Sequence, residues 1–137
     1  MKTMFRKPIL WLTLLVVGLL SGCIAFGAPL NADEQAKIDQ QIRESVEKTF
    51  PLPGQVVIRT HVGDDLRFST GLSVEEVTAF YRNAYTIKGY VEGAGGLVSA
   101  ENATLLFQKE DEKDVTLDVM RNENGSDVHI QLGSPTP

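Results

Sequence analysis

The sequence predicts an α+β domain, with an antiparallel sheet of about five strands in the order α-β-β-α-β-β-β and the main helix packed on one face. Stretches with strand-like alternation are separated by short turns, which favours antiparallel pairing. Residues 77–85 instead repeat apolar side chains at helical spacing, as in a helix that lies on a sheet. A length of 137 residues, of which 42% are hydrophobic, is ordinary for one globular domain.

The first residues have the pattern of an export signal. Lys2, Arg6 and Lys7 precede an apolar run over residues 9–20, and no acidic residue lies among them. Such a run is too short for a membrane span, which needs about 20 apolar residues. A basic start followed by a short apolar run is typical of a secretory signal peptide, which we predict over residues 1–22.

The apolar run ends in Leu20-Ser21-Gly22-Cys23, which resembles the lipobox of bacterial lipoprotein precursors. The resemblance implies that Cys23 carries a diacylglycerol thioether and that a signal peptidase cleaves immediately before it. Two acyl chains on one residue bind a membrane far more stably than one. The expected location is therefore the bacterial cell membrane, or the outer membrane of a Gram-negative cell. The alternative is an uncleaved signal anchor in which Cys23, the only cysteine, is an idle thiol.

The charge of the chain argues against nucleic acid as a partner. Its 18 acidic residues exceed its 13 basic residues, and binding to phosphates requires a basic face. Removal of residues 1–22 takes away three positive charges, so that the formal charge becomes −8 in place of −5. Residues 23–30 show no periodic pattern and predict a lipidated tether, from which the acidic domain stands off anionic headgroups.

Residues 31–50 predict an N-terminal amphipathic helix. Asn31 lies three residues before Glu34, which is the spacing of a helix cap, and Ile38, Ile42 and Val46 follow at spacing four. This apolar stripe is narrow, so we expect the helix to pack by one edge against the core or a partner. A helix that lies on the membrane is the alternative, but the acidic residues of this segment outnumber its basic residues.

Two strand-like stretches, residues 55–61 and 66–70, follow a proline- and glycine-rich end of this helix. A short turn separates them, so they predict a β-hairpin. Regular alternation places Val56 and Ile58 on one face of the first strand and His61 on the other.

The second helix has the clearest local signature. Ser73 is the expected N-cap and Glu76 the acid that reciprocates, while Gly89 is expected to end the helix. A broad apolar face indicates that this helix lies on the sheet. The residues of that face are Val77, Phe80, Tyr81, Ala84 and Tyr85.

Three further strands are predicted after a glycine-rich connector at residues 92–96. Their expected ranges are about 103–108, 115–121 and 127–132. An Asn-Gly pair between the last two is a strong hairpin signal. The expected organisation is a signal peptide at 1–22, a tether at 23–30, a helix at 31–50, an α+β domain at 51–133 and a disordered tail at 134–137.

A family resemblance covers residues 51–132. The segments that carry it are Pro51-Leu52-Pro53-Gly54, Leu66-Arg67-Phe68-Ser69-Thr70, Leu72-Ser73-Val74-Glu75-Glu76-Val77 and Phe80-Tyr81-Arg82. This pattern resembles a small exported domain that recurs in uncharacterised bacterial lipoproteins. The segments form a hairpin, a helix cap and a helix face, so the resemblance implies a fold and brings no activity, cofactor or catalytic residue.

Candidate chemistry is sparse. His61 and His129 are the only histidines, and a metal shared between them would need neighbouring strands and an acid such as Asp64. We expect neither a metal site nor a cofactor site. The serines lack a Gly-x-Ser-x-Gly context and Cys23 is committed to lipid, so no nucleophile is paired with a base.

Three functional hypotheses follow. The first is a non-enzymatic binding or accessory module of the cell envelope, which binds a protein or other component through its polar sheet face or its glycine-rich loop. The second is a small hydrolase or metal-dependent enzyme that uses His61 or His129. The third is a structural or inhibitory lipoprotein. A cleft lined by a histidine and acids would favour the enzyme, and a flat apolar patch would favour a binder.

Overall fold

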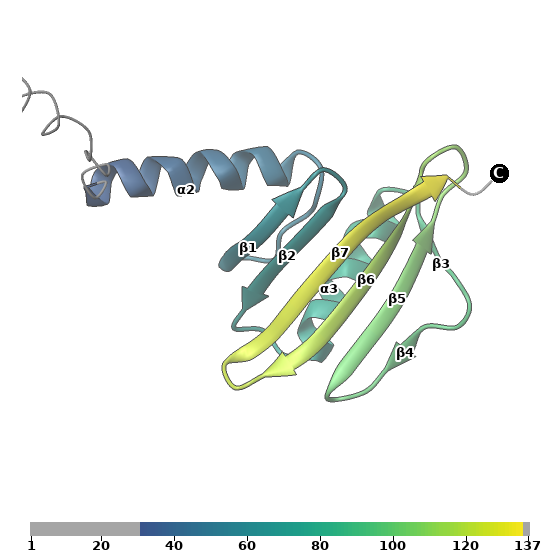
Figure 1. Cartoon of the computed structure of the whole chain (residues 1–137). Helices are drawn as coiled ribbons and strands as arrows, with labels where there is room; N and C mark the ends of the chain where they lie inside the picture. Colours follow the sequence, from purple (N-terminus) through teal and green to yellow (C-terminus); the bar gives the residue numbers. More distant parts are fainter. Residues whose placement is uncertain (1–30, 136–137) are drawn as a thin grey trace, which may run out of the picture. The chain divides into compact units, whose positions relative to one another are not determined.

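The computed structural model describes residues 31–135, so the predicted signal peptide, Cys23 and the tether lie outside the described residues. The elements in chain order are α2 (Ala32–Glu47), β1 (Val56–Val62), β2 (Asp65–Thr70), α3 (Val74–Ile87), β3 (Val91–Glu92), β4 (Leu97–Val98), β5 (Asn102–Gln108), β6 (Lys113–Asn122) and β7 (Gly125–Pro135). The expected α+β class is confirmed, with one antiparallel sheet in the strand order β1-β2-β7-β6-β5-β3 and β4 also paired with β5 (Figure 1). Within residues 31–135, neither helix is long and apolar enough to cross a membrane.

The chain divides into two compact units, and the boundary falls inside α2, after Ile38. In the first unit the helix begins at the expected cap. The Asn31 side chain accepts a hydrogen bond from the N–H of Glu34 at 2.8 Å, and the Glu34 carboxylate accepts one from the N–H of Asn31 at 3.3 Å. This reciprocal pair satisfies N–H groups that the start of a helix otherwise leaves without a partner.

The second unit begins at Asp39 and contains the end of α2, the sheet and α3. Val46 and Phe50 are fully buried in the same hydrophobic core as the strands. We expected a separate helix up to residue 50 and a domain from residue 51. The domain begins earlier because these two side chains complete its core.

Two short strands raise the strand number from the expected five to seven. β3 and β4 lie at the two ends of the glycine-rich connector, which we expected to be a loop, and both pair with β5. The connector can lie this close because Gly93 and Gly96 have no side chain. A Cβ at Gly93 would lie 3.3 Å from the Leu106 side chain, and a Cβ at Gly96 would lie 3.2 Å from the Leu105 side chain. Strands of two residues are too short to show alternation, so the sequence pattern could not predict them.

The last strand of the chain, β7, lies in the middle of the sheet. It pairs with β6 through the predicted hairpin turn and with β2 on its other side. At Gly125 the backbones pass so closely that a Cβ would lie 2.2 Å from the carbonyl oxygen of Thr70. β6 is long enough to pair with β7 along its whole length, so β7 includes Ser134 and Pro135. We expected these two residues in the disordered tail.

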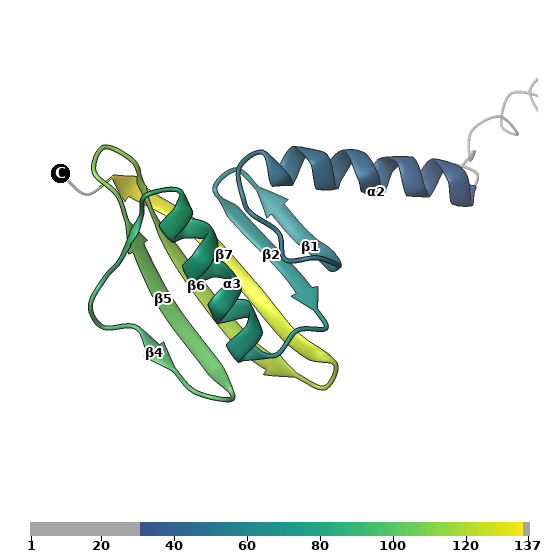
Figure 2. The same cartoon turned by 180° about the vertical axis from the view of Figure 1, so that it is seen from behind.

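The helix α3 covers one face of the sheet (Figure 2). It begins with the predicted capping box, in which Ser73 Oγ accepts from the N–H of Glu76 at 3.3 Å and the Glu76 carboxylate accepts from the N–H of Ser73 at 2.8 Å. Phe80, expected on the core face, is only half-buried, because that face is centred on Tyr81. The buried residues of α3 are Val74, Val77, Thr78, Tyr81 and Tyr85.

Candidate functional site

The sheet face opposite α3, seen from the front in Figure 1, is the candidate site, and we call it the open face. Strand alternation produces it, since Leu66 and Phe68 of β2 are buried in the core while Arg67 between them is exposed. A hollow of about 800 Å³ lies on the open face. Its polar lining consists of Arg59, Arg67, Ser69, Asn102, Thr104, Asp118, Asp127 and His129.

A hydrogen-bonded row on the open face joins three strands. Arg59 Nε of β1 donates to Ser69 Oγ of β2 at 3.1 Å, and Ser69 Oγ donates to Asp127 Oδ1 of β7 at 2.6 Å. The register between β2 and β7 places Ser69 directly opposite Asp127. The pairing of these two strands therefore fixes a cation and a carboxylate at defined places on the surface.

A second group is centred on Asp65. His129 Nε2 lies 2.6 Å from Asp65 Oδ2, and Arg67 Nε lies 3.5 Å from Asp65 Oδ1. The hydrogen bond with His129 is the main reason that the pKa of Asp65 lies below its ordinary value. The positive charge of Arg67 lowers this pKa further, and partial burial opposes the shift. His129 also lies opposite Asp118 across the β6–β7 pair.

This lowered pKa gives a pH-dependent prediction. The pKa of Asp65 is lower in the folded than in the unfolded chain. The carboxylate therefore stabilises the fold above the ordinary pKa of aspartate, and this stabilisation is lost as the pH falls through the lowered pKa of the folded state. Urea denaturation should show Asp65→Asn less stable than the wild type at about pH 7, with the difference between the two free energies of unfolding shrinking as the pH falls below the ordinary aspartate range. A difference of equal size at all these pH values would contradict the assignment.

Asp118 and two apolar side chains complete the hollow. Thr104 Oγ1 donates to Asp118 Oδ1 at 2.7 Å, between β5 and β6. Met120 and Leu97 border these polar groups, and both are largely exposed. The open face thus offers charges of both signs, hydrogen-bonding groups and apolar contact, a combination that suits a polar partner surface or an extended polar ligand.

The structure shows that the predicted orientation of His61, on the face of β1 opposite to Val56 and Ile58, was wrong. β1 contains a bulge after Ile58, and beyond it His61 lies opposite the buried residue Leu66. One extra residue reverses the side-chain phase of a strand. His61 therefore points to the core face, where its ring meets Phe50 edge-on at 5.8 Å between centroids. His129 points to the open face.

The two histidines therefore lie on opposite faces of the sheet and do not form a shared site. Asp64, the acid considered for such a site, instead pairs with Lys113, with 2.6 Å between Oδ2 and Nζ. The acid that contacts His129 is Asp65, the residue after Asp64 in the chain. In the part of the chain from residue 31 to 135, no group of three or more His, Cys, Asp or Glu side chains could hold a metal ion.

The hollow does not bring Ser69 and His129 together as a nucleophile and its base. A serine nucleophile needs a base within hydrogen-bonding distance of its hydroxyl. Ser69 lines the same hollow as His129, but its hydroxyl is engaged by Arg59 and Asp127. Ser69 is therefore not placed as a nucleophile with His129 as its base.

Most residues of the hollow were not singled out in the sequence. Alternation marks Asp65, Arg67 and Ser69 as one polar face of a strand, which is a usable signal. The proximity of Asp118 and Asp127 to that face depends on which strands are neighbours, and no local pattern contains this information. Comparison of the chain with protein-family models, with curated proteins and with solved structures finds no match.

Proposed function

We propose that this protein is an exported lipoprotein, anchored through Cys23 to a membrane of the bacterial cell envelope, and that its domain is a non-enzymatic binding module. The anchor rests on the resemblance of Leu20-Ser21-Gly22-Cys23 to a lipobox. The binding role rests on the open face, and the partner is a protein or another component of the envelope with a polar surface.

One observation carries the binding role: the polar side chains of the open face are held in place before any ligand arrives. Arg67, His129 and Asp118 occupy one cross-strand row, and hydrogen bonds or ion pairs within the sheet hold each of them. Side chains that are already ordered lose less conformational entropy on binding. Met120, with 65% of its surface exposed, provides apolar area beside that row.

Site-specific crosslinking in cells tests this proposal. A photo-crosslinking amino acid in place of Met120 should give an adduct of one discrete mass, because this position borders the hollow. The matched control is Ile87, which is 77% exposed but belongs to α3 on the opposite side of the sheet. The control position should give no such adduct.

A charge reversal supplies the second arm of the experiment. Arg67→Glu combined with Asp118→Lys should abolish the Met120 adduct, since it inverts two charges of the hollow while leaving the core untouched. Thermal unfolding of the double variant checks that the domain still folds. Adducts of equal yield at positions 87 and 120, or an adduct that survives the charge reversal, would count against the open face as the binding site.

A further inference from the structure

The two edges of the sheet differ greatly in length. One edge consists of β3 and β4, which have two residues each, whereas the other is β1, Val56–Val62, with seven residues and β2 as its strand partner. In an antiparallel pair, every second residue points its N–H and C=O away from the partner strand. Within residues 39–135 these outward groups of β1 meet no further strand, so β1 is a template for an added strand.

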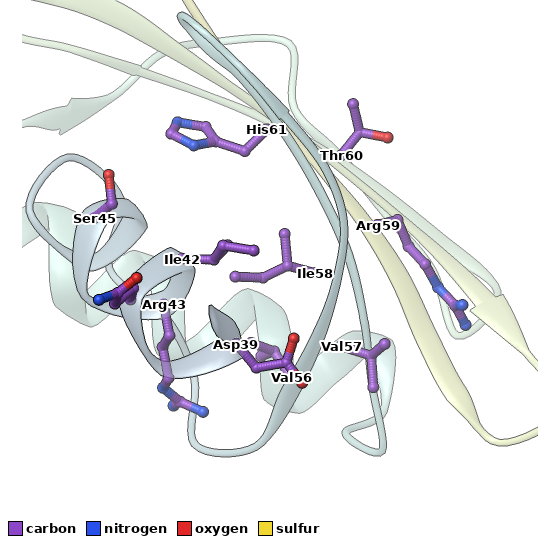
Figure 3. A pocket seen from close by; sticks show the side chains of 11 residues that line it. Asp39, Ile42, Arg43, Ser45, Val56, Val57, Ile58, Arg59, Thr60 and His61 are labelled. Atoms are coloured by element: carbon purple, nitrogen blue, oxygen red, sulfur yellow. The ribbon is translucent and has the colours of Figure 1, made fainter. Parts of the chain in front are cut away.

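A groove of mixed lining, with apolar side chains at its centre, runs beside this edge. It has a volume of about 660 Å³ and lies between residues 39–45 of α2 and β1. Figure 3 shows Ile42 and Ile58 pointing toward one another across the groove, with His61 on the same side of the strand and Arg59 pointing away. Ile42 keeps 42% of its surface exposed. A strand added to β1 would place every second side chain in this groove.

Charge at the edge discriminates between possible occupants. β1 carries Arg59 and His61 but no acidic residue, so two copies of β1 paired with each other would bring no opposite charges together. Two such chains, each with a strongly negative formal charge, would also repel one another. Arg59 makes no ion pair within the described residues, so it can pair with an acidic side chain of a different protein. Arg43, also at the groove, is already paired with Glu47 at 2.8 Å.

We propose that β1 and this groove bind an extended segment of a partner protein as an added strand. The backbone of the segment bonds to the free edge of β1. Its apolar side chains enter the groove beside Ile42 and Ile58, and an acidic side chain on its other face meets Arg59. This site is separate from the hollow of the open face, although Arg59 borders both.

The test uses the full chain in phosphatidylcholine nanodiscs and a fluorescent eight-residue peptide with valine at every second position and glutamate or threonine between. Fluorescence anisotropy should show saturable binding at peptide concentrations below about 1 mM. Two further peptides carry N-methyl groups on the valine amides or on the other amides. Alternate amides face opposite edges of a strand, so only one of the two methylated peptides loses its hydrogen bonds to β1. That peptide should bind at least about tenfold more weakly than the parent peptide, and the other should bind as well as the parent.

Variants of the protein locate the site. Ile42→Asp should weaken binding at least about tenfold, because it puts a charge in place of the apolar side chain that faces Ile58 across the groove. Ile87→Asp, an exposed isoleucine away from the groove, should leave the Kd unchanged.

Three outcomes would overturn the inference. The first is the absence of saturable binding, and the second is equal binding by both methylated peptides and the parent peptide, which would exclude strand addition even if Ile42→Asp failed to fold. The third is self-association of the unliganded chain that Ile42→Asp abolishes, because a second copy would then be the occupant.

Discussion

Replacement of Tyr81 by alanine should lower the free energy of unfolding by about 3 to 5 kcal/mol, the range for loss of a large buried aromatic side chain. Tyr81 is fully buried between α3 and the sheet. Its hydroxyl donates a hydrogen bond to the carbonyl oxygen of Pro51 at 2.8 Å, and burial raises the pKa of Tyr81, so that it stays protonated as a donor. Urea denaturation of residues 31–137 measures the effect.

Two milder variants serve as controls for this result. Tyr81→Phe keeps the ring and removes the hydrogen bond to Pro51, so it should cost about 1 kcal/mol. Ser73→Ala removes the cap of the same helix and should also cost about 1 kcal/mol. If Tyr81→Ala were no more destabilising than Ser73→Ala, the position of α3 on the sheet would be wrong.

Replacement of Cys23 by alanine should remove the lipid from the protein completely. Cys23 is the only cysteine, so no other thiol can accept a diacylglycerol group. Metabolic labelling with an alkyne-tagged fatty acid should mark the wild type and leave Cys23→Ala unlabelled. The variant should persist as a precursor, or leave the membrane if another peptidase cleaves it.

A neighbouring substitution controls for damage to the signal peptide. Ile24→Ala changes the residue after the cysteine and keeps the lipobox-like segment intact, so its labelling should equal that of the wild type. Equal labelling of the wild type and Cys23→Ala would refute the lipid anchor. The binding proposals concern the folded domain and would not be affected by this result.

Local signals predicted much of the fold. The capping box of Ser73 and Glu76 and the end of the helix near Gly89 are encoded within a few residues, and the structure confirms both. The hairpin turns at residues 62–65 and 122–125 are likewise confirmed. In each case the residues that specify the feature are sequence neighbours, so spacing alone was sufficient.

Features that depend on distant neighbours escaped prediction. The bulge in β1 shifts His61 to the core face, and no residue type in that strand announces it. The strands β3 and β4 exist because glycines let the connector lie against β5. The open-face hollow escaped for the same reason, since Arg67 and His129 meet only because β2 and β7 are paired.

The central position of β7 has a consequence for how the protein folds. Arg67 and His129 are cross-strand neighbours although 61 residues separate them in the sequence, so their pairing closes a long loop. Domains dominated by such non-local pairing fold slowly. A chain synthesised from its amino end keeps the inner edge of β2 uncovered until the last strand is made. We therefore expect a chain cut before residue 125 to yield two unjoined parts that are prone to aggregation, and not a smaller stable domain.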